Sequence, residues 1–166
     1  MAIRCSSLLL GIMCLLSVQL ADTEEDKPFV FKASAWTQHG SREFKFFGTG
    51  SSWKEAEKVC MRSGALLASV HDKNEDKFIK RLIQSHTGQD RPTWLGGKPS
   101  DAGRWVWSDG SDFDFTKWTR GQPDGSGRCL QTNHKGRWDD LVCTEKRPFV
   151  CARQTGKWWS RKPELT

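Results

Sequence analysis

The stretch that decides the fold reads Trp94-Leu95-Gly96-Gly97, then Trp105-Val106-Trp107-Ser108-Asp109-Gly110, then Gln122-Pro123-Asp124, then Trp138-Asp139-Asp140, and it closes with Cys143 and Cys151. It combines core-type tryptophans with tight Asp-Gly and proline turns. Its last two motifs concentrate oxygen-bearing side chains between cysteines. This order favours short strands joined by turns, with the chemistry carried between residues 121 and 143.

Two helices are predicted upstream of these motifs. Ser52 and Glu55 have the spacing of a capping box, which predicts a helix over residues 52–63 that ends at Gly64. Asp72 and Glu75 repeat that spacing, and the apolar residues that follow have helical periodicity. The second helix is therefore expected over residues 72–87, before a glycine at position 88.

The rest of the domain has the pattern of short strands. They are predicted at residues 93–96, 105–107, 130–132, 135–138 and 149–152, with an earlier strand around residues 44–47. The apolar residues 65–70 are expected to form either a buried strand or a connector. Trp53, Trp94, Trp105 and Trp107 are expected in the core. Two helices on a mostly antiparallel sheet make an α+β domain.

The first 21 residues read as a secretory signal peptide, with Arg4 before a short apolar run. We therefore expect a secreted, extracellular product. Two of the six cysteines, Cys5 and Cys14, fall in that segment. The other four are expected to form disulfides, for which the sequence alone allows three pairings.

The chain is moderately basic, with 26 Lys and Arg against 20 Asp and Glu among 166 residues. This balance predicts either attraction to anionic surfaces or simply solubility. A nucleic-acid partner is not expected. An acidic segment at 22–32 precedes the domain at 33–153, and a basic aromatic tail follows at 154–166. Trp158 and Trp159, flanked by cations, suit an anionic membrane surface, and a terminus without a role is the alternative.

Four oxygen donors come from two neighbouring segments. Gln122 and Asp124 flank a proline, and Asp139 and Asp140 follow from the next predicted strand. Calcium takes six to eight oxygen ligands, so these residues could supply most of a calcium site. The alternative is that the carboxylates only stabilise turns.

The tryptophan motifs, Gln122-Pro123-Asp124 and Trp138-Asp139-Asp140 together resemble the C-type lectin-like domain, over residues 36–153. The resemblance implies that fold, with an unusually short long-loop region, and disulfides Cys60–Cys151 and Cys129–Cys143. It also implies a cis proline at position 123 and a galactose-type sugar site of Gln122, Asp124 and Asp139. His134 is added to the sugar site because it lies close to that loop in the sequence. The calcium ligands would be Gln122, Asp124, Asp139 and Asp140.

This chain departs from the family pattern beside that site. The acidic residue expected before Cys129 is absent, and Arg128 places a cation there. Two functions therefore stay open. One is a lectin for galactose-terminated or microbial glycans, calcium-dependent and acting in innate defence. The other is a calcium-independent interaction protein of toxin, antimicrobial or antifreeze type. An enzyme is not expected, because no catalytic constellation stands out.

Overall fold

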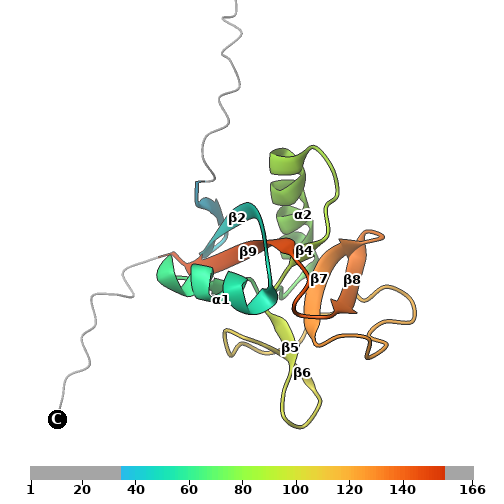
Figure 1. Cartoon of the computed structure of the whole chain (residues 1–166). Helices are drawn as coiled ribbons and strands as arrows, with labels where there is room; N and C mark the ends of the chain where they lie inside the picture. Colours follow the sequence, from blue (N-terminus) through green and yellow to red (C-terminus); the bar gives the residue numbers. More distant parts are fainter. Residues whose placement is uncertain (1–34, 156–166) are drawn as a thin grey trace, which may run out of the picture. The chain divides into compact units, whose positions relative to one another are not determined.

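Residues 35–155 are those described by the computed structural model, and they form two sheets and two helices (Figure 1). The strands are β1 (Thr37–His39), β2 (Arg42–Ser51), β3 (Leu66–Leu67), β4 (Thr93–Trp94), β5 (Gly97–Pro99), β6 (Trp105–Trp107), β7 (Cys129–His134), β8 (Arg137–Leu141) and β9 (Arg147–Gln154). The helices are α1 (Trp53–Arg62) and α2 (Lys73–Thr87). The predicted signal peptide, the acidic segment and most of the tail lie outside the described residues.

The larger sheet has the order β1-β2-β9-β4-β7-β8, with β3 also paired to β9. The first long strand and the last one, β2 and β9, pair antiparallel through the middle of the domain. β4 runs parallel to β9, while β5 and β6 form a separate hairpin. The predicted α+β class with a mostly antiparallel sheet is confirmed.

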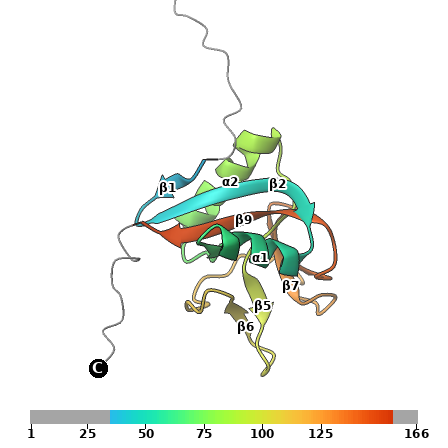
Figure 2. The ribbon, with the colours of Figure 1, turned by 60° about the vertical axis from the view of Figure 1, so that its left-hand side comes forward.

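The helices α1 and α2 lie on opposite sides of the β2–β9 pair (Figures 1 and 2). Side chains alternate between the two faces of a strand. Accordingly, Phe149 and Cys151 of β9 join the cluster that contains α1, whereas Val150 and Ala152 join the cluster that contains α2. One strand thus supplies both cores, and this explains its nearly continuous apolar sequence.

The helix ends agree with the predicted caps except at one residue. Ser52 and Glu55 form the complete capping box of α1, and Gly88 ends α2 in the left-handed conformation. Asp72 caps α2 by accepting from the backbone N–H groups of Asn74 and Glu75. The Glu75 side chain does not return to the cap, so the second capping box is wrong.

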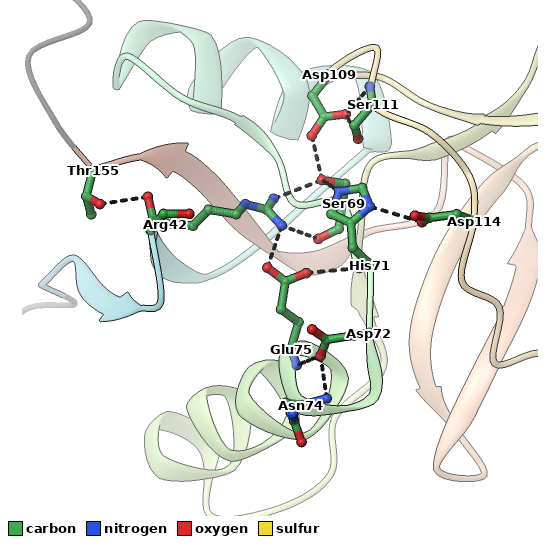
Figure 3. Close-up of polar contacts among 11 residues, drawn as sticks. Arg42, Ser69, His71, Asp72, Asn74, Glu75, Asp109, Ser111, Asp114 and Thr155 are labelled. Atoms are coloured by element: carbon green, nitrogen blue, oxygen red, sulfur yellow. Dashed lines mark hydrogen bonds and ion pairs between the residues drawn. The ribbon is translucent and has the colours of Figure 1, made fainter.

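Glu75 instead belongs to a buried polar network that crosses the domain (Figure 3). Arg42 of β2 donates to Glu75 at 2.8 Å and to the Ser69 hydroxyl at 2.8 Å. That hydroxyl donates in turn to Asp109 at 2.5 Å, and His71 lies 3.0 Å from it. The network joins β2, the segment before α2, α2 itself and the turn after β6.

Other predictions of local structure need smaller corrections. The strand predicted at 135–138 begins at Arg137, because Lys135 and Gly136 form a turn with φ of 48° and 73°. Trp53, Trp94 and Trp107 are buried as expected, but Trp105 is only half-buried. Both disulfides implied by the resemblance are present, Cys60–Cys151 and Cys129–Cys143.

Candidate sugar-binding site

The loop at residues 121–127 brings Gln122 and Asp124 together. The Gln122–Pro123 peptide bond is cis, as the resemblance implied. The Gln122 side-chain oxygen accepts from the backbone N–H of Asp124 at 2.9 Å, and its amide nitrogen donates to the Asp124 carboxylate at 3.1 Å. Asp124 is exposed and Gln122 is half-exposed, so this amide–carboxylate pair faces solvent.

Asp140 holds the loop from beneath. One carboxylate oxygen accepts from the backbone N–H of Asp124 and the other from that of Gly127, both at 2.9 Å. The side chain is almost fully buried, at 1% exposure. Charge-assisted hydrogen bonds of this kind fix backbone geometry. Asp140 is therefore a support of the loop, and its carboxylate oxygens face loop N–H groups.

Residue 127 has to be a glycine, because the loop passes so close to β8 that a side chain has no room there. A Cβ atom built there would lie 2.0 Å from the carbonyl carbon of Leu141. Ser126 adds a hydrogen bond from its hydroxyl to the Asp140 carbonyl at 3.2 Å. The short loop is thus clamped along β8 by Ser126, Gly127 and Asp140.

Asp139 makes its contacts with a different group of residues. Its carboxylate accepts from the Gln131 amide at 2.9 Å and lies 3.4 Å from the His134 ring nitrogen Nδ1. The Arg147 guanidinium donates to the Gln131 side-chain oxygen at 3.2 Å. The structure therefore brings together Gln122, Asp124 and Asp140, and it pairs Asp139 with His134.

Sequence reasoning missed Gln131 and Arg147. Neither residue belongs to a recognisable motif. The strand register that sets Gln131 opposite Asp139 follows from the β7–β8 pairing. A correctly placed β8 would have revealed the first of these partners, since residues facing each other across two strands interact directly.

The four predicted calcium ligands are divided between two hydrogen-bonded groups in this structure. Within residues 35–155, no group of three or more His, Cys, Asp or Glu side chains is placed to hold a metal. Asp140 has each carboxylate oxygen bonded to a backbone N–H, and Asp139 is bonded to Gln131. Calcium needs six to eight oxygens that converge on one point. In this structure Gln122, Asp124 and Asp140 meet at the loop while Asp139 contacts Gln131, so joint binding of calcium by the four residues stays a prediction.

Asp124 is well suited to accept hydrogen bonds from a ligand. The hydroxyl and the backbone N–H of Ser126, followed by the Gln122 amide, hold the pKa of the Asp124 carboxyl below its usual range. The carboxyl therefore stays ionised at neutral and mildly acidic pH.

Aromatic rings form the wall behind β8. The Trp138 indole is fully buried, and Trp107, Phe113, Phe115 and Trp118 surround it with ring centroids 5.6–6.2 Å away. Phe115 and Trp118 are half-buried, so their outer edges reach solvent. Trp138 is therefore a core residue. Because its ring is fully buried, it cannot stack on a sugar.

The domain combines two helices with a mostly antiparallel sheet, and its first long strand pairs with its last one. Two disulfides and the cis-proline loop beside β8 complete the set of features by which a protein family can be recognised. The family model for the Lectin C-type domain matches residues 49–153, and the chain belongs to this family. None of the helices within residues 35–155 combines the length and apolar character needed to cross a membrane.

Two curated fish proteins are similar to it. "Galactose-specific lectin nattectin" of Thalassophryne nattereri is 44% identical over 71% of this chain and 77% of the relative. "Ladderlectin" of Oncorhynchus mykiss is 40% identical over 69% of this chain and 64% of the relative. A solved calcium-independent type II antifreeze protein has 33% identity and a TM-score of 0.65, covering 72% of this chain and 91% of that one.

Proposed function

We propose that the protein is a secreted lectin that binds galactose-type sugars through the loop at residues 121–127. The observation that carries this proposal is the solvent-facing pair of the Gln122 amide and the Asp124 carboxylate, 3.1 Å apart. Neighbouring sugar hydroxyls can each donate and accept, so one fixed donor beside one fixed acceptor suits them. The relative named as galactose-specific, at 44% identity, supports the same sugar class.

The order of the donor and the acceptor sets the preferred sugar. Gln122→Glu combined with Asp124→Asn exchanges the amide and the carboxylate and reverses the hydrogen-bond polarity of the loop. We expect free galactose to inhibit binding to a glycan-coated surface better than mannose does. The exchanged variant should reverse that order. Equal inhibition of the unmutated protein by both sugars would contradict the proposal.

We further propose that binding does not require a tightly held calcium ion. Asp139 and Asp140 already have polar partners, and the exposed Arg128 adds positive charge beside the loop. Galactose binding should therefore persist in EDTA. The four-ligand site predicted from the sequence is tested by the same experiment, with calcium titrated up to several millimolar. Loss of binding in EDTA, restored by calcium, would show that calcium completes the site.

We propose that Asp139 and His134 extend the site beyond the amide–carboxylate pair. Their carboxylate and ring nitrogen lie 3.4 Å apart, and the His134 side chain is 35% exposed. His134→Ala should weaken binding of a galactose-terminated oligosaccharide more than binding of galactose alone, because this extension lies beyond the amide–carboxylate pair.

The biological setting that we propose is defence at microbial surfaces, with the basic aromatic tail adding contact to anionic membranes. Residues 156–166 of the tail lie outside the described residues, while Thr155 is held by two hydrogen bonds to the Ser41 carbonyl, both 2.7 Å. A truncation after Thr155 should thus keep sugar binding and lose affinity for anionic vesicles. Equal vesicle binding by both forms would exclude a role for the tail.

A further inference from the structure

Four cationic side chains gather around the turn between β7 and β8. Lys135 belongs to the turn, Arg137 is the first residue of β8, and both are exposed. Lys80 of α2 donates to the Gly136 carbonyl at 2.6 Å, which brings its ammonium group to the same place. Lys117 lies alongside as well, because its carbonyl accepts from the backbone N–H of Trp138 at 2.8 Å. We call these four residues the turn cluster.

The positive charge of the turn cluster is only partly neutralised. Lys80, at 3.1 Å, and Lys117, in closer contact, share the single carboxylate of Asp76, which is buried. Burial, and then the neighbouring Lys117, lower the pKa of Lys80. Within residues 35–155, Lys135 and Arg137 have no acidic group within ion-pair distance. Four cations thus face one carboxylate.

Two short segments of the chain connect the turn cluster to the proposed sugar loop. Lys117 and Gln122 are joined by a short segment in which the Gln122 backbone N–H donates to the Thr119 carbonyl at 2.9 Å. Arg120, in the same segment, is exposed. On β8, Arg137 lies three residues before Asp140, whose carboxylate holds the loop. Three residue steps along a strand cover about 10 Å, which is a span for an oligosaccharide rather than for one ring.

We propose that the turn cluster is a second subsite, which binds the acidic group of a galactose-containing oligosaccharide whose neutral galactose occupies the Gln122–Asp124 loop. The inference rests on the proposed function and names its ligand class, an anionic glycan carrying sulfate or carboxylate. The guanidinium of Arg137 can offer two parallel N–H donors to such a group, and the lysines add point charges. Exposed cations placed in this way also speed the approach of an anionic ligand.

The test compares a sulfated galactan with the same polymer after chemical desulfation, using the full chain. The variant Lys135→Gln/Arg137→Gln removes the two exposed cations and spares Lys80 and Lys117, which neutralise the buried Asp76. The control Lys54→Gln/Lys58→Gln removes the same charge from α1, where both lysines are exposed. Sialylated and unsialylated galactosides form a second arm that distinguishes carboxylate from sulfate.

We expect the unmutated protein to bind the sulfated polymer about tenfold more tightly at low salt, with the gain decreasing as salt rises. The Lys135/Arg137 variant should lose most of this gain and keep its affinity for the desulfated polymer. The α1 control should keep both. Equal affinity for the two polymers, or equal loss in the control, would overturn the subsite.

Failure of the galactose proposal gives a different result. In that case desulfated galactan and free galactose do not bind, whereas sulfate-dependent binding that requires Lys135 and Arg137 would support an anion site alone. Equal binding of dextran sulfate, a glucan, by the unmutated protein would overturn the requirement for galactose. Gln122→Glu/Asp124→Asn should alter the neutral component and leave the sulfate gain unchanged.

Discussion

At the scale of single residues, the loop at residues 121–127 depends on Gly127, which is needed for lack of space and not for a left-handed backbone conformation. A Cβ atom at Gly127 would lie 2.0 Å from the backbone of Leu141, so Gly127→Ala must push the loop away from β8. Overpacking of this kind costs about 1–3 kcal/mol of unfolding free energy. We expect that loss in urea unfolding, together with weaker galactose binding.

The matched control is Gly48→Ala in β2, where the nearest side-chain atom to the new Cβ would be an ordinary 3.5 Å away. It should leave galactose binding unchanged. Wild-type sugar affinity in Gly127→Ala would mean that the clamp along β8 does not position the binding pair.

Glu55 is the residue with the clearest predicted response to acid. The Lys146 ammonium, followed by the backbone N–H and hydroxyl of Ser52, lowers the pKa of Glu55 from 4.5 to about 2. A carboxylate with a depressed folded pKa stabilises the fold above its unfolded pKa, and this contribution is lost as pH falls through the folded value. Glu55→Gln should therefore lower the Tm at pH 7, with a deficit that shrinks between pH 4.5 and pH 2. A deficit that is the same at pH 7 and pH 2 would refute this role.

At the scale of elements, the buried pair of Arg42 and Glu75 joins β2 to α2. Their side chains are 10% and 11% exposed, and they meet at 2.8 Å. Removing one partner of a buried pair leaves an uncompensated charge and costs about 3–5 kcal/mol. Arg42→Met should show that loss in denaturant unfolding, and Arg42→Met/Glu75→Gln should recover part of it.

A surface pair provides the comparison. Lys146 and Glu55 are 60% and 57% exposed, so Lys146→Met should cost only about 0–1 kcal/mol. If the two single variants lose similar stability, the Arg42 network does not join β2 to α2 in the way described.

The N-termini of α1 and α2 differ in how well the sequence predicts their caps. Ser52 and Glu55 lie three residues apart and satisfy each other, so local spacing was sufficient to predict the start of α1. Asp72 and Glu75 have the same spacing, but Arg42, which is 33 residues away in the chain, donates to one Glu75 carboxylate oxygen, and the other oxygen accepts from the backbone N–H of His71 instead of that of Asp72. A local motif cannot reveal a distant competitor for the same group.

In the candidate site, some features could be predicted from the sequence and others depend on distant contacts. The cis peptide bond before Pro123 and both disulfides agreed with the family pattern. Asp139 and Asp140 are consecutive residues of β8, and their side chains point to opposite faces of the strand, so their joint binding of one ion stays a prediction. Each aspartate found a different hydrogen-bond partner, Gln131 for Asp139 and the loop backbone for Asp140.

At the scale of the whole molecule, the two disulfides constrain the chain over very different lengths. Cys60 and Cys151 are separated by 91 residues, whereas Cys129 and Cys143 are separated by 14. In the chain-entropy description, closing a loop of about 100 residues stabilises the fold by about 4.7 kcal/mol, and one of about 15 residues by about 3 kcal/mol.

Their locations predict different consequences for function. Cys60–Cys151 connects α1 to the central strand β9, so Cys60→Ser/Cys151→Ser should lower unfolding free energy more and expose both cores. Cys129–Cys143 ties the ends of the β7–β8 segment beneath the sugar loop. Cys129→Ser/Cys143→Ser should therefore lower the unfolding free energy less than the Cys60/Cys151 variant does. It should weaken the galactose affinity of the folded protein more. Urea unfolding and galactose titration of both double variants measure the two effects. A larger loss of affinity in the folded Cys60/Cys151 variant would mean that α1, rather than the β7–β8 hairpin, holds the loop in its binding geometry.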